Sequence, residues 1–159
     1  MRAGRAPHHR DGFTAVELAI VVIILAIAAA AAVPKYADAL NRFRVDAAAR
    51  RIAADLATAQ ARARATSSSQ TILFTLPPQG SQYQIAGMKD PDRPAATYTV
   101  NLADSPYLVT LSSANLGGDT TLVYNGYGIP DSGGTVVVCS GQSTKTVTID
   151  ATTGMAAIQ

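Results

Sequence analysis

Apolar and polar positions divide the chain into three regions with different periods. From Leu18 to Val33 no side chain is polar, from Lys35 to Arg64 apolar residues recur at intervals of three and four, and from Thr71 onward they alternate in short runs. These patterns are typical of a helix in lipid, an amphipathic helix and a set of strands, respectively. The sequence therefore predicts a long helix followed by antiparallel strands, which is an α+β fold.

The apolar run is long enough to cross a membrane. Phe13 to Val33 is about 21 residues, and a helix of that length spans a hydrocarbon layer of roughly 30 Å. A cleaved secretory signal is the alternative, because Arg2, Arg5 and Arg10 form a basic flank before the run. The run is longer than the roughly 7–15 apolar residues of such a signal, which favours a single spanning helix. Basic residues also follow the run, so their count does not set the orientation.

Glu17 is the one charged residue inside this predicted span. A charged side chain at membrane depth costs roughly 2.5–3.5 kcal/mol on insertion scales, and such residues usually face a partner instead of lipid. Glu17 therefore predicts that the helix assembles with other chains.

The second region predicts an amphipathic stem helix with two apolar stripes. The first stripe should be buried against the chain's own β-sheet, and it consists of Val45, Ala49, Ile52, Leu56, Ala59 and Ala63. The second stripe consists of Tyr36, Leu40, Phe43 and Ala47. At about 100° per residue it lies on the opposite side, so we expect it to face neighbouring subunits or lipid headgroups. Pro34 should bend the helix and not end it, whereas Ser67 to Ser69 should end it.

Charged residues on the stem alternate in sign every four positions. The series is Asp38, Arg42, Asp46 and Arg50, and the pair Arg51 and Asp55 repeats the spacing. Such spacing is typical of a solvated helix face with weak ion pairs. The alternative is that these charges pair between subunits.

Short β-prone runs separated by turn residues fill the rest of the chain. The predicted strands are Thr71 to Leu76, Tyr83 to Ala86, Thr97 to Leu102, Tyr107 to Leu111, Thr121 to Tyr124, Thr135 to Cys139, Thr146 to Ile149 and Met155 to Ile158.

Composition argues against several kinds of chemistry. The only histidines, His8 and His9, precede the apolar run, so a chain cut before Phe13 has no histidine for a catalytic pair or a zinc site. The lone cysteine, Cys139, follows three valines and is predicted to be a buried, inert thiol. No glycine-rich phosphate loop opens a helix.

Two further motifs are better explained as turns than as sites. Asp90-Pro91-Asp92 contains carboxylates that suit calcium, but the spacing matches no EF-hand and the proline favours a turn. The segment 124–128, Tyr-Asn-Gly-Tyr-Gly, has aromatic rings that could stack on bases. From Ala65 onward, however, three basic residues oppose six aspartates, which argues against nucleic acid as a partner.

The N-terminal motif resembles that of a known superfamily. Gly12-Phe13-Thr14, with Glu17 and Pro34 at these spacings, closely resembles the class III signal of type IV pilins and type II secretion pseudopilins. Later segments are similar to the H-type minor pseudopilins and their fimbrial T-type relatives: 50–63, 71–74, 136–140 and 147–154. The resemblance does not extend to residues 79–118.

The resemblance implies a processing event and a fold. A prepilin peptidase would cut on the cytoplasmic side between Gly12 and Phe13, and Phe13 would become the N-methylated first residue. The ammonium of Phe13 could then neutralise Glu17 of a neighbour where the dielectric is low. The implied fold is type IV pilin-like: a long N-terminal helix, membrane-spanning in its first half, packed on an antiparallel β-sheet head.

The resemblance also implies a domain order and a function. We expect a leader at 1–12, a transmembrane segment at 13–33, a stem helix at 34–66 and a periplasmic head at 67–159. The implied function is a structural minor pseudopilin of type II secretion, anchored in the bacterial inner membrane, with no enzymatic activity and no cofactor. The alternative is a minor type IV pilin for pilus assembly or DNA uptake. Implied partners are the peptidase, other pseudopilins or minor pilins, an inner-membrane assembly platform and membrane lipid.

Overall fold

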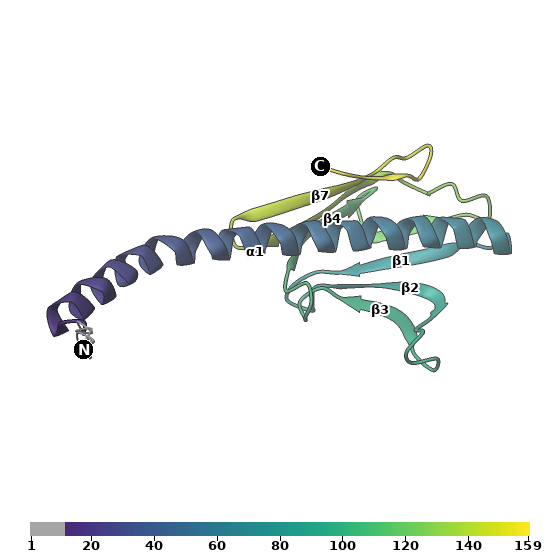
Figure 1. Ribbon diagram of the computed structural model, residues 1–159. Coiled ribbons are helices and arrows are strands. Elements are labelled where there is room, and N and C mark those ends of the chain that lie inside the picture. Colours follow the sequence, from purple (N-terminus) through teal and green to yellow (C-terminus); the bar gives the residue numbers. More distant parts are fainter. Residues whose placement is uncertain (1–11) are drawn as a thin grey trace, which may run out of the picture. The chain divides into compact units, whose positions relative to one another are not determined.

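The computed structural model describes residues 12–159, so predictions that concern residues 1–11 lie outside the described part. The chain forms two compact units that divide between Ala37 and Asp38. One helix, α1 (Ala15–Thr66), contributes to both units (Figure 1). Pro34 lies inside α1, so the helix does not end at the proline.

The C-terminal end of α1 is closed by the predicted serines. Ser67 adopts a left-handed conformation with φ of 48°, and its N–H donates to the carbonyl of Arg64 at 3.4 Å. The N–H of Ser68 donates to the carbonyl of Ala63 at 3.2 Å. These two bonds form a Schellman motif, which pairs carbonyls that the helix itself leaves without a donor.

Two four-stranded antiparallel sheets follow the helix. The first has the order β3-β2-β1-β5, with the bounds β1 Gln70–Thr75, β2 Gln82–Lys89, β3 Thr97–Asn101 and β5 Thr121–Tyr124. The second has the order β4-β6-β7-β8, with the bounds β4 Thr110–Leu116, β6 Gly134–Ser140, β7 Ser143–Ile149 and β8 Ala156–Ile158. The sequence led us to expect one sheet, and the structure corrects this expectation to two.

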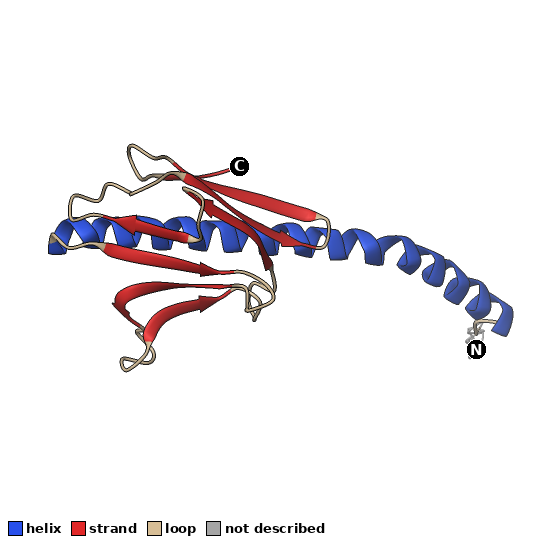
Figure 2. Cartoon of the chain, turned by 180° about the vertical axis from the view of Figure 1, so that it is seen from behind, coloured by secondary structure: helices blue, strands red, loops and turns tan. Residues whose placement is uncertain are grey.

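Both sheets pack on the same side of α1 in the second unit (Figures 1 and 2). The predicted first stripe of the stem is confirmed, because every one of its six residues is buried. Facing it are alternate residues of the strands, including Ile72, Phe74, Leu122, Val136 and Val138. Burial of each large apolar side chain contributes about 1.5–3 kcal/mol, so this core fixes α1 on the sheets.

The fourth predicted strand is wrong in position. The strand is β4, and Tyr107 and Leu108 lie in the loop before it. Both residues donate their N–H to the carbonyl of Asp104, and Leu108 has φ of 53°, which is not an extended conformation. The segment that does form β4 contains Ser113 and Asn115, whose weak strand preference is overridden by pairing with β6.

Candidate assembly surface

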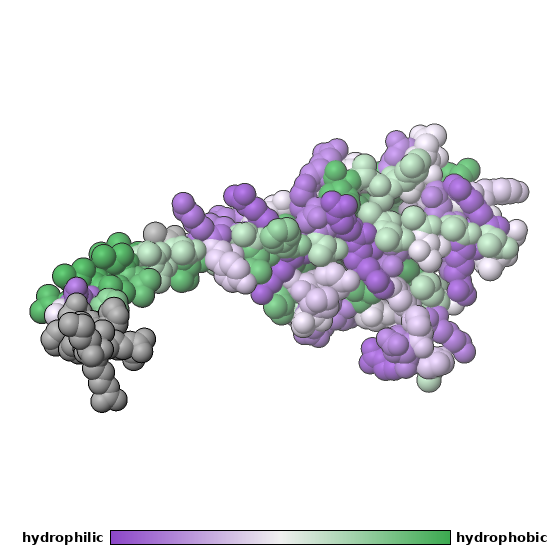
Figure 3. Space-filling model, viewed as in Figure 1, coloured by the Kyte–Doolittle hydropathy of each residue, from purple (hydrophilic) through white to green (hydrophobic). Residues whose placement is uncertain are grey.

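The first unit presents an apolar surface. Large apolar side chains from Val16 to Val33 are exposed, and Figure 3 shows the apolar colour over this part of α1. Among the described residues, α1 is the one helix whose length and composition suit a membrane crossing. Exposed side chains of this kind must be covered by lipid or by other chains.

Glu17 takes part in a capping box at the start of α1. The N–H and the hydroxyl of Thr14 both donate to Oε2 of Glu17 at 2.9 Å, and the N–H of Glu17 donates to Oγ1 of Thr14 at 3.2 Å. The spacing Thr-x-x-Glu before an apolar run is itself a signature of this motif, so the capping box was predictable from the sequence although it was not predicted above. Oε1 of Glu17 accepts no hydrogen bond from the rest of residues 12–159. Oε2 of Glu17 therefore caps the N-terminus of α1, and Oε1 is available to a partner.

The two residues at the predicted cleavage site, Gly12 and Phe13, lie just before α1. Phe13 precedes α1 and its side chain is 88% exposed. Gly12 lies directly before Phe13, and an added Cβ on Gly12 would meet nothing within 4 Å. The peptide bond between the two residues therefore lies in an open stretch of chain.

The second stripe of the stem has its two aromatic side chains exposed. In the first unit Tyr36 is 68% exposed, and in the second unit Phe43 is 73% exposed and Leu40 is half-buried. Ala47 is exposed as well. These side chains have the composition of a contact surface, because aromatic residues are enriched at protein interfaces.

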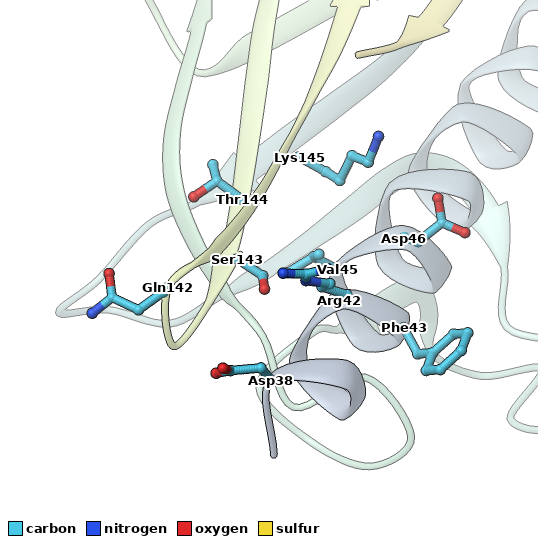
Figure 4. Close-up of a pocket in the computed structure, with 9 residues that line it drawn as sticks. All are labelled: Asp38, Arg42, Phe43, Val45, Asp46, Gln142, Ser143, Thr144 and Lys145. Carbon is cyan, nitrogen blue, oxygen red and sulfur yellow. The ribbon is translucent and has the colours of Figure 1, made fainter. Parts of the chain in front are cut away.

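A cleft of about 550 Å³ lies beside the stem in the second unit. Its walls come from residues 38–46 of α1 and from residues 142–145 at the start of β7. Figure 4 shows that Arg42 extends from α1 toward Ser143, whereas Phe43 points away from β7. Asp38 and Arg42 form no ion pair with any residue in the described part of the chain, although their spacing would allow one.

Asn41 joins the stem to the hairpin that forms this cleft. The hydroxyl of Ser140 donates to Oδ1 of Asn41 at 3.1 Å. Gly141 has φ of 56°, which favours glycine, and an added Cβ would lie 2.5 Å from Nδ2 of Asn41, so the Asn41 amide would have to move. Nothing in the local sequence pattern indicated this contact.

The charge series on the stem behaves in two different ways. Arg50 pairs with Asp46 at 2.7 Å on the surface, as predicted for a solvated face. Asp55 is 8% exposed, so the same prediction is wrong for the pair Arg51 and Asp55. The reason is that Asp55 faces two tyrosines of the first sheet.

The Asp55 network consists of Asp55, Arg51, Tyr83 and Tyr98. Oδ2 of Asp55 accepts from the hydroxyls of Tyr83 at 2.5 Å and Tyr98 at 2.8 Å, and from Nε of Arg51 at 3.1 Å. The guanidinium of Arg51 also donates to the hydroxyl of Tyr98. Burial and the charge of Asp55 raise the pKa of Tyr83 above its ordinary value. A buried carboxylate with several donors fixes the register between α1 and the first sheet.

The residues of the other candidate motifs have structural roles. Asp90 accepts from the N–H of Asp92 at 2.9 Å and from Arg93 at 3.3 Å, which forms a turn. Within residues 12–159, no group of three or more His, Cys, Asp or Glu side chains is placed to hold a metal ion. Cys139 is half-buried and not fully buried, which corrects that part of its prediction.

The turn predicted at 124–128 is confirmed, because the N–H of Gly128 donates to the carbonyl of Asn125 at 2.7 Å. The two tyrosines of the segment have opposite environments. Tyr124 is fully buried at the end of β5, whereas Tyr127 is 82% exposed. Burial raises the pKa of Tyr124 to about 12. Since only one ring is exposed, the segment offers no pair of rings for stacking on bases.

The family model described as Type II transport protein GspH matches residues 48–153. This chain belongs to that family. The matched range covers residues 48–66 of α1 and the strands β1 to β7, but not β8, and it includes residues 79–118, where no resemblance was evident from the sequence. The GspH family consists of structural pseudopilin and pilin proteins, and membership supports a minor pseudopilin or pilin role for the chain.

The chain is also similar to one solved structure, the type IV minor pilin FimU of Pseudomonas aeruginosa. The identity is 18%, the TM-score is 0.48, and the match covers 74% of this chain and 88% of that chain. No match was found among curated proteins. The motif from Gly12 to Pro34 lies outside the range matched by the GspH family model.

Proposed function

We propose that this chain is a minor pseudopilin of a type II secretion system, anchored in the inner membrane with its head in the periplasm. The observation that carries the proposal is the combination of GspH family membership with an exposed apolar segment of α1 whose first turn contains a carboxylate. A family member with such a helix needs both a membrane and a partner for the charge. No enzymatic step is required for this role.

Processing at the N-terminus would prepare the chain for assembly. A prepilin peptidase cuts between Gly12 and Phe13, and the new amine of Phe13 is methylated. Charge complementarity supports the next step, because the ammonium of Phe13 in one subunit can bind Oε1 of Glu17 in another, the oxygen that Thr14 leaves open. Insertion of the subunit into a filament then neutralises the charge of Glu17, which lipid alone cannot neutralise.

The stem would supply the second contact of the assembled filament. Tyr36, Leu40 and Phe43 pack against neighbouring subunits, and Pro34 bends the helix at the membrane boundary. The inner-membrane assembly platform and other pseudopilins are the partners in this step. The exposure of Tyr36 and Phe43 supports this contact.

The test replaces Glu17 in the full chain produced in secreting cells. Glu17→Gln keeps the size and an acceptor for the Thr14 hydroxyl but removes the charge. N-terminal sequencing should start at methylated Phe13 in the wild type and the variant alike, while incorporation into the filament fraction should fall about tenfold or more in the variant. Val16→Ala is the control, because it removes only apolar atoms from the same turn. A start other than Phe13, or normal assembly and secretion by the variant, would contradict the proposal.

A further inference from the structure

The second unit exposes three large side chains where α1 ends. Tyr127 is 82% exposed, Met155 is 68% exposed and Ile129 is 47% exposed. Together with Arg64 in the last turn of α1, we name them the α1-end surface. Tyrosine, methionine and arginine are enriched at protein interfaces, whereas single exposed apolar residues are common on any protein. Whether these residues form one surface therefore depends on how their loops are held.

The loops that carry these side chains meet at Gln60. Its Nε2 donates to the carbonyl of Gly128 at 2.8 Å and to that of Thr153 at 2.6 Å. The hydroxyl of Tyr124 donates to the carbonyl of Gly154 at 2.9 Å. Ile129 and Met155 each directly follow one of these anchored residues, so both lie next to the same buried side chain of α1.

Glycines allow the loops to approach the helix this closely. Gly154 has φ of 71°, and an added Cβ would lie 2.7 Å from Nε2 of Gln60 and 2.8 Å from Tyr124. Gly128 has φ of 74°, and an added Cβ would lie 2.4 Å from Nε of Arg64. The left-handed conformation favours glycine at both positions, and at Gly154 a Cβ would also collide with the buried ring of Tyr124. The α1-end surface is thus held by its backbone, which lowers the entropy cost of binding a partner.

Arg64 supplies a cation without an acidic partner. Its Nε donates to the carbonyl of Tyr127 at 3.2 Å, and no carboxylate in residues 12–159 forms an ion pair with it. A hollow of about 470 Å³ lies beside it, lined by Arg64, Ser67, Gly126 and Tyr127. The guanidinium has further N–H groups that can donate to a carboxylate in a bidentate pair.

We propose that the α1-end surface docks an acidic segment of another pilin-like subunit, with a carboxylate on Arg64 and apolar atoms on Tyr127 and Met155. Two copies of this surface would bring two guanidinium groups together, which disfavours self-pairing. The surface lies about 42 Å along α1 from Asp38, where the helix enters the second unit. A subunit inserted later from the membrane would approach the Asp38 end, so the subunit on the α1-end surface is one added earlier. This inference rests on the proposed function.

The test places a photo-crosslinking benzoylphenylalanine at Tyr127 in the full chain, in cells that make the whole system. Irradiation should yield an adduct whose partner peptide comes from a different pilin-like subunit and contains Asp or Glu. Arg64→Glu should reduce the yield of this adduct about tenfold or more, and Arg64→Gln should reduce it less. Arg62→Glu is the matched control, because Arg62 also donates to one backbone carbonyl, that of Gly87, at 3.1 Å. The control should leave the yield unchanged.

A second crosslinking position separates failure of this inference from failure of the proposed function. The same probe at Phe43 should report packing of the stem. An adduct from Phe43 without an adduct from Tyr127 would overturn the α1-end surface and leave the proposed function intact. No adduct at either position would count against both. An adduct of Tyr127 only with a second copy, with exported cargo or with lipid would also overturn the inference, as would equal loss of yield in Arg62→Glu and Arg64→Glu.

Discussion

Two aspartates on α1 with the same spacing to an arginine have different energetic roles. Arg50 is exposed and Asp46 is half-buried, so water screens the pair and it contributes at most about 0.5 kcal/mol. Asp55 is buried and accepts three hydrogen bonds to one oxygen, two of them from tyrosines of the first sheet. Its removal would leave the hydroxyls of Tyr83 and Tyr98 without their acceptor inside the core. The decrease in the free energy of unfolding therefore comes from the loss of a buried acceptor and not from the loss of an ion pair.

We therefore expect Asp55→Ala to lower the free energy of unfolding by about 3 kcal/mol, whereas Asp46→Ala should change it by less than about 0.5 kcal/mol. Urea unfolding of the full chain in detergent, followed by circular dichroism, measures both values. Tyr83→Phe should cost about 1–2 kcal/mol, because Asp55 keeps its other donors. Similar costs for the two alanine variants would show that the Asp55 network does not stabilise the fold.

At the scale of elements, α1 has two faces with separate purposes. The face that includes Ile52 and Leu56 is buried on the two sheets, and the face that includes Phe43 is exposed. The periodicity of the stem predicted this division. It did not predict that Asn41 and Gln60 would hold loops of the second sheet, or that Ser67 would close the helix in a Schellman motif.

Substitutions on the two faces of α1 should have different effects on stability and on assembly. Ile52→Ala should lower the free energy of unfolding by about 2–5 kcal/mol, because it opens a cavity between α1 and the sheets. Phe43→Ala should change stability by less than about 0.5 kcal/mol and still reduce incorporation into filaments. Unfolding in detergent and the filament fraction of cells provide the two measurements. Normal incorporation of a stable Phe43→Ala protein would remove Phe43 from the assembly surface.

At the scale of the whole molecule, the distribution of charge argues against DNA uptake. Seven basic residues lie from Lys35 to Arg64, whereas the chain from Ala65 onward has three basic residues and six aspartates. Phosphate binding needs a surface of basic residues, and its affinity falls steeply with salt. In the second unit, Arg42 and Arg64 each line a hollow, and neither forms an ion pair with a residue that the structure describes.

Gel-shift titration of the full chain in detergent with duplex DNA provides the measurement. We expect no retardation at about 150 mM salt, and any binding at low salt should be weak, because few phosphates can be contacted. Tight, salt-dependent binding that Arg42→Glu or Arg64→Glu removes would favour the minor type IV pilin that takes up DNA.

The sequence by itself determined the α+β order of elements, the buried stripe of the stem and the N-terminal motif that includes Glu17. Each of these is a local pattern, because helical and strand periods are set by the backbone of neighbouring residues. Only the tertiary structure decided that Asp55 is buried while Asp46 is only half-buried, that the strands form two sheets, and that the loops after Tyr124 and Asp150 meet at Gln60. The reason is physical: an Asp with an Arg four residues away has the same pattern in water as in a core. The partner that distinguishes the two cases, such as Tyr83, lies far along the chain.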